Sequence, residues 1–130
     1  MHYRLAAIIL AVSACNSVQA QDLTAVRPLR GYACMQLAIT PEQSVDPKVG
    51  VPVRDAPSRS ASIVSYAAST MIVQEPPQPI GGFLRVLRFT GQEGWIEAHY
   101  LRPWVNKFVP TARCVPSIMS NGRPGFGSSE

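Results

Sequence analysis

The chain has 130 residues, with 12 prolines, 9 glycines and only 15% charged residues. This length suffices for one small domain, and the frequent helix breakers exclude a fold built from long helices. The formal net charge of +4 comes from scattered basic residues, which favour anionic partners in general but are equally typical of an ordinary solubilising surface.

The N-terminus has the pattern of a secretion signal. Arg4 precedes an unbroken apolar run over residues 5–12, and residues 1–4 contain no acidic residue. A basic start followed by a short apolar run is typical of a signal peptide, and the run is too short to span a bilayer. We therefore expect an exported, periplasmic protein.

Two processing sites compete behind this signal. Val18-Gln19-Ala20 is a small-x-small cleavage site, which would make residues 1–20 a signal peptide. Val12-Ser13-Ala14-Cys15 resembles a bacterial lipobox, which would make residues 1–14 a lipoprotein signal and Cys15 a lipidation site. The second route would anchor the protein to a membrane through lipid alone.

Both processing routes leave two of the three cysteines available for a disulfide. Cys15 is either acylated or removed with the signal, which leaves Cys34 and Cys114 to pair in an oxidising envelope. Their bridge would close a loop of about 80 residues, worth about 4–5 kcal/mol in the chain-entropy model. It would also tie the C-terminal tail to the first strand. The alternative is two free thiols.

Beyond the signal, the sequence indicates short strands separated by loops. Residues 21–30 are polar and are interpreted as a linker, and the strands fall within residues 31–103. Apolar and β-branched runs predict strands at residues 31–39, 49–54, 62–66, 70–74, 83–89 and 94–98. Short strands at such close spacing predict an all-β fold, a small barrel or a sandwich.

Strand periodicity separates the two faces of the hairpin over residues 83–98. Because side chains alternate between faces, one face carries the natural core positions: Leu84, Val86, Ile96 and Ala98. Phe83 and Trp95 then lie on the opposite face. Two large aromatic residues that point away from a core suggest a binding groove.

Four motifs follow one another in the same region. Val51-Pro52-Val53-Arg54 forms an opening strand, and Gly82-Phe83-Leu84-Arg85-Val86 stands where a G-W-x-x-V segment would be. Gly94-Trp95-Ile96 is a closing G-W-V/I segment, and Ala98-His99-Tyr100-Leu101 matches the single helical turn that follows it. In the order and spacing of these motifs, residues 50–103 resemble the bacterial SH3 (SH3b) family.

This resemblance implies a fold and a class of function. Family members are strongly bent β-barrels of about five strands that bind ligands and do not catalyse reactions. The remaining residues would then be embellishments, an extra N-terminal strand and a C-terminal extension over residues 104–130 held by the disulfide. In eukaryotic SH3 domains the corresponding G-x-I-P-x-x-Y segment lines a groove for Pro-rich peptides. Glu97 replaces that proline here, which argues against PxxP recognition.

The candidate ligand-binding surface combines aromatic residues with two charged residues of matching parity. Flat aromatic faces suit sugar rings, extended peptides or cationic side chains. The predicted set is Phe83, Arg85, Trp95, Glu97, Tyr100 and Trp104. The alternative is that the aromatic residues pack beneath the N-terminal strand or the tail.

We therefore expect a non-catalytic binding module of the bacterial cell envelope that recognises peptidoglycan or an envelope protein. An alternative is a structural accessory subunit that offers the barrel as an interaction platform in an envelope complex. Export argues against nucleic acid as a partner, and the sequence suggests no cofactor and no metal site. A thiol enzyme pairing His99 with Cys34 or Cys114 is a third hypothesis, but the predicted disulfide accounts for both thiols.

Overall fold

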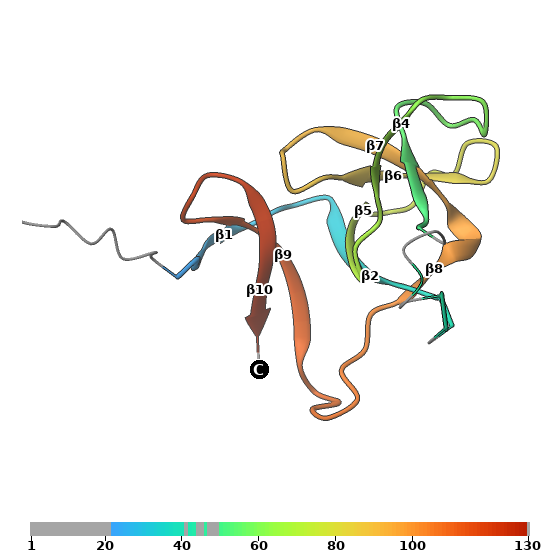
Figure 1. The fold of residues 1–130 in the computed structure, drawn as a ribbon. Coiled ribbons are helices and arrows are strands. Elements are labelled where there is room, and N and C mark those ends of the chain that lie inside the picture. Colours follow the sequence, from blue (N-terminus) through green and yellow to red (C-terminus); the bar gives the residue numbers. More distant parts are fainter. Residues whose placement is uncertain (1–21, 41, 44–45, 47–49, 130) are drawn as a thin grey trace, which may run out of the picture.

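The computed structural model describes residues 22–40, 42–43, 46 and 50–129. In these residues, ten strands and one 3-10 turn build two antiparallel sheets (Figure 1). The predicted signal segments and Cys15 lie outside the described residues.

The larger sheet has seven strands in the order β4-β3-β7-β6-β5-β2-β8. Its members are β2 (Tyr32–Leu37), β3 (Pro52–Arg54), β4 (Ile63–Tyr66), β5 (Thr70–Gln74), β6 (Phe83–Leu87), β7 (Glu93–Glu97) and β8 (Leu101–Pro103). The 3-10 turn η1 (Ala98–Tyr100) connects β7 to β8. The predicted strand positions and the helical turn after β7 are therefore confirmed, with shifts of a few residues at their ends.

The all-β class is confirmed, but the described residues form two sheets and not the small barrel of about five strands that the resemblance implies. Within the described residues neither sheet closes on itself. The reason lies in β2, which was expected to be a peripheral extra strand. It pairs with β5 on one side and with β8 on the other, so β8 ends the sheet beside β2 while β4 ends it at the far edge.

The segments expected to be a linker and a tail form the smaller sheet. Its three strands are β1 (Ala25–Pro28), β9 (Arg113–Met119) and β10 (Pro124–Ser129), with β9 in the centre. Figure 1 shows this sheet beside the larger one, with the chain passing from β1 directly into β2. Residues 21–30 therefore contain a strand, because the C-terminal hairpin offers β9 as a partner for it.

Glycines allow the C-terminal hairpin to pack tightly. Gly122 turns the chain with a φ of +78°, a conformation that L side chains rarely adopt. A Cβ on Gly125 would lie 2.5 Å from Met119 Cγ, so the absence of a side chain there makes room for the buried Met119. This glycine-rich segment is thus an ordered strand and not a loose tail.

The hydrophobic core lies against one face of the larger sheet. Its buried members are Leu37, Val51, Val53, Met71, Val73, Leu84, Val86 and Ile96, with Ala98 packed at its margin. The face assigned to the core from strand periodicity is therefore confirmed. Burial of these aliphatic side chains is the main non-covalent contribution to the stability of this sheet.

Gly94 lets β7 approach β3 within this core. A Cβ at position 94 would lie 2.5 Å from Val53 Cγ1 and 3.3 Å from the Arg54 carbonyl oxygen. Val53 has an exposed fraction of 0%, so it has little room to move aside. We expect Gly94→Ala to lower the free energy of unfolding by about 1–3 kcal/mol, the usual range for an overpacked core. Urea denaturation measures the loss, and Thr90→Ala in the exposed turn of the same hairpin is the control. Equal midpoints for the two variants would contradict this account.

The predicted disulfide between Cys34 and Cys114 is present, and it joins the two sheets. It links β2 to β9 with a Cα–Cα distance of 6.0 Å across a sequence separation of 80 residues. A second contact is the edge-on packing of Phe89 against Phe126, with ring centroids 5.4 Å apart. The covalent bond and this aromatic pair position the smaller sheet on the larger one.

Removing the disulfide should lower stability substantially. We expect the double variant Cys34→Ala/Cys114→Ala to lose about 2–5 kcal/mol, because its unfolded chain regains the freedom that the cross-link removes. Urea denaturation of the parent protein with and without reductant should show the same loss. Reductant should leave the stability of the double variant unchanged. A parent protein whose denaturation midpoint does not change with reductant would refute the prediction.

Candidate functional site

Phe83 and Trp95 lie on the face opposite the core, as their parity predicts, but both side chains are buried. Their exposed fractions are 4% and 9%. On the same face, Ile72 is fully buried at 0%. The open aromatic surface expected from Phe83 and Trp95 is therefore not present in the structure.

Residues 55–61 are drawn across this second face by two interactions. Arg54, the cross-strand neighbour of Trp95, donates from Nη1 to the carbonyl oxygen of Ala61 at 2.8 Å. Arg59 Nε pairs with Glu97 Oε1 at 2.7 Å. Because Glu97 has the same parity as Trp95 on β7, and Arg54 is the cross-strand neighbour of Trp95, both anchors lie on the face of the sheet that carries the indole ring.

Arg85 lies beside Trp95 on the same face of the sheet, as strand parity predicts. The two residues are cross-strand partners on β6 and β7, and the guanidinium carbon lies 4.8 Å from the centre of the indole ring. Arg85 Nη1 also lies 3.4 Å from Glu93 Oε2. The guanidinium thus occupies an indole face through a cation–π contact, a face that a ligand would otherwise stack on.

The remaining predicted residues lie elsewhere. Tyr100 packs against the core from η1, with its ring 4.0 Å from that of His99 between centroids. Trp104 follows β8 at the other end of the larger sheet. The structure therefore brings Phe83, Arg85, Trp95 and Glu97 together but leaves Tyr100 and Trp104 apart from them.

Burial gives Trp95 a structural role that can be measured. We expect Trp95→Ala to lower the free energy of unfolding by about 3–5 kcal/mol, because it removes a large buried ring and leaves a cavity. Trp104→Ala, which removes a half-buried ring, should cost clearly less. Chemical denaturation followed by far-UV circular dichroism compares the two, and a Trp95→Ala protein as stable as the parent would show that its ring is not part of the packing.

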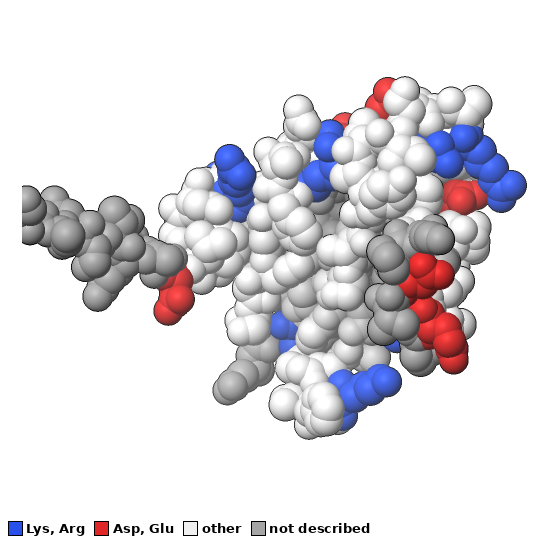
Figure 2. All heavy atoms as spheres, viewed as in Figure 1, with Lys and Arg blue, Asp and Glu red and all other residues white. Residues whose placement is uncertain are grey.

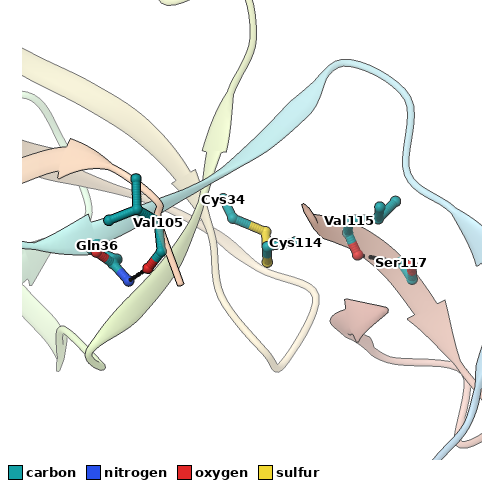
Figure 3. The surroundings of a disulfide bond; sticks show 6 residues. All are labelled: Cys34, Gln36, Val105, Cys114, Val115 and Ser117. Carbon is teal, nitrogen blue, oxygen red and sulfur yellow. Dashed lines mark hydrogen bonds between the residues drawn. A yellow bond between two sulfur atoms is a disulfide. The ribbon is translucent and has the colours of Figure 1, made fainter. Parts of the chain in front are cut away.

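Trp104 lines two adjoining grooves beside the disulfide, between the two sheets. Their volumes are about 590 Å³ and about 700 Å³, and Trp104, Arg113 and Cys114 border both. Phe126 of β10 contributes to the first groove and Tyr32 of β2 to the second. Figure 3 shows the disulfide crossing between the sheets at this place. The smaller sheet thus forms one wall of a site whose other wall is the larger sheet.

A hydrogen bond fixes the segment that carries Trp104. Gln36 Nε2 on β2 donates to the carbonyl oxygen of Val105 at 2.8 Å (Figure 3). Gln36 and Cys34 share one face of β2, since they are two residues apart. The chain leaving β8 is therefore held against the face of β2 from which the disulfide extends, and this places the indole ring at the grooves.

The electrostatic character of the grooves is positive. Among the described residues that border them, Arg113 is the only charged one, and no carboxylate is present. Polar groups are supplied by Asn106 and Thr70 in the first groove and by Tyr32 and Thr111 in the second. A groove bordered by an arginine and an indole ring, with amide and hydroxyl groups in its lining, can hold a carboxylate and a flat ring at the same time.

Of the residues predicted for the site, only Trp104 lies at these grooves. The predicted ligand-binding set did not include Tyr32, Arg113 or Phe126. Tyr32 was placed in a predicted strand without a role, and Arg113 and Phe126 fell in residues 104–130, which were interpreted as a tail. The predicted disulfide was the one signal that could have found them. It required residue 114, and therefore its neighbour Arg113, to lie beside β2.

Comparison of the chain with models of protein families, with curated proteins and with solved structures found no match. In the part of the chain that the structure describes, no three His, Cys, Asp or Glu residues are grouped so as to hold a metal ion. Within the same residues, no helix is long and apolar enough to cross a membrane.

Proposed function

We propose that the protein is a non-catalytic binding module of the bacterial cell envelope, and that the grooves beside the disulfide bind peptidoglycan. The observation that carries the proposal is the pairing of Trp104 with Arg113 in the borders of both grooves. Peptidoglycan combines sugar rings with peptide carboxylates. An indole face stacks on a ring, and a guanidinium binds a carboxylate through two parallel hydrogen bonds.

The shape of the site also favours a polymer. The two grooves adjoin along Trp104, Arg113 and Cys114 and stay open to solvent on both sides of the disulfide. An extended chain could therefore lie along both without having to enter a closed cavity. The disulfide and the Gln36–Val105 hydrogen bond hold the walls in place before binding, which reduces the entropy cost of association.

The resemblance to SH3b domains supports a binding role. The antiparallel pairing of β6 with β7 and the turn η1 that follows β7 are consistent with the segments over residues 82–86 and 94–96 and the single helical turn on which the resemblance rests. The smaller sheet is the reason why the proposed site differs from the one expected from the sequence. It supplies a groove at Trp104, while the Trp95 ring is buried.

A sedimentation assay with insoluble peptidoglycan tests the proposal. The parent protein should pellet with the polymer at low and at moderate salt. Trp104→Ala and Arg113→Gln should each weaken binding roughly tenfold or more, since a stacking or charge-assisted contact contributes on the order of 1–2 kcal/mol. Phe108→Ala is the matched control, because Phe108 is aromatic and lies on the same connection but does not border either groove.

Other outcomes of this assay would contradict the proposal. Pelleting that disappears at moderate salt, whatever the variant, would indicate generic charge attraction only. No pelleting at all would favour the alternative of an accessory subunit, for which co-purification of a stoichiometric partner under mild detergent is the appropriate measurement.

A further inference from the structure

The connection between β8 and β9 carries the most exposed aromatic side chain among the described residues. Phe108 has an exposed fraction of 94%, and its neighbours Val105 and Val109 have 58% and 48%. Lys107 stands among them and is exposed as well. In Figure 1 this connection extends from the foot of the molecule, away from both sheets. It forms an apolar tip with a cationic group, which we define as residues 105–109.

Hydrogen bonds hold the tip in this conformation. Asn106 Oδ1 accepts from the backbone amides of Phe108 at 2.9 Å and of Val109 at 3.1 Å. The carbonyl oxygen of Val109 then accepts from the amide of Ala112 at 2.9 Å. An asparagine that caps two amides in this way stabilises a tight turn. The apolar side chains are therefore presented to solvent by a defined turn.

The surroundings of the tip are basic. Residues 101–113, which comprise β8, the connection with the tip and the start of β9, contain Arg102, Lys107 and Arg113 and no Asp or Glu. In Figure 2, basic and uncoloured side chains form the lower end of the molecule, and acidic atoms lie to their right. The charge next to the apolar tip is thus complementary to an anionic surface.

We propose that this tip inserts into the headgroup region of an anionic lipid bilayer. A protein partner would need about 800 Å² of matching surface, whereas the tip is convex and consists of one phenylalanine and two valines. A fluid bilayer interface requires no preformed pocket. It accepts small apolar protrusions and attracts nearby Lys and Arg side chains when the lipids are anionic. Phe108 and the two valines would enter the interface, and Lys107 would contact the phosphates.

Insertion of the tip would also fix the position of the two grooves relative to the membrane surface. Asn106, within the tip, and Ala112, three residues after it, border the first groove, and Ala112 also borders the second. A protein held by this tip would therefore present its grooves close to the membrane surface. The proposal is independent of peptidoglycan binding, since Phe108 borders neither groove.

Co-sedimentation with lipid vesicles tests the insertion. All proteins carry Cys15→Ser, so that no acyl chain can contribute. Binding to vesicles of phosphatidylglycerol and phosphatidylcholine should exceed binding to phosphatidylcholine alone. Phe108→Ala should weaken it at least roughly tenfold, the consequence of losing one buried phenyl ring, and Lys107→Glu should weaken it mainly at low salt. Ile80→Ala, which alters a 52% exposed apolar residue on another loop, should bind like the parent.

A local probe gives a second readout. A polarity-sensitive fluorophore attached through Phe108→Cys should shift to a more apolar environment when anionic vesicles are added, and the same probe at Ile80→Cys should not. Absence of vesicle binding, or binding that Phe108→Ala leaves unchanged, would overturn the proposal. A shift at both probe positions would also overturn it. Trp104→Ala should retain vesicle binding, so failure of the peptidoglycan assay would leave this test intact.

Discussion

The bond between Cys34 and Cys114 determines how the two halves of this protein are combined. Each sheet satisfies its own backbone hydrogen bonds, and the core cluster belongs to the larger sheet alone. The smaller sheet has few buried apolar side chains, with Met119 the main one. A covalent link across 80 residues restricts the unfolded chain strongly, and it places β9 beside β2 where apolar burial alone would be weak. The grooves proposed for ligand binding exist only because of this placement.

The same structure explains why the aromatic residues divide into two roles. Trp95 is 9% exposed and has the guanidinium of Arg85 against its ring, so it contributes to packing. Trp104 follows strand β8 and is half-buried between two sheets whose facing surfaces do not close over it. The residue type is the same in the two cases. The degree of burial in the tertiary structure decides which ring remains available for a ligand.

Two proposed contact surfaces meet at the connection between β8 and β9. Its base borders the grooves, and its tip presents Phe108 to solvent. The basic charge of residues 101–113 would favour both proposed contacts, since peptidoglycan carboxylates and anionic lipids are attracted by the same field. A module that contacts the wall polymer with one surface and a bilayer with the other would act where these two structures face each other.

The sequence by itself determined the all-β class, the positions of strands β2 to β7, the core face with Leu84, Val86 and Ile96, and the pairing of Cys34 with Cys114. These follow from local periodicity and from cysteine arithmetic, which need no knowledge of distant contacts. Tertiary structure decided the rest. The insertion of β2 between β5 and β8 opened the expected barrel, and the pairing of β1 with β9 turned a linker and a tail into a sheet. The burial of Trp95 and the position of Arg113 depend on segments far apart in the chain, whose meeting no local pattern encodes.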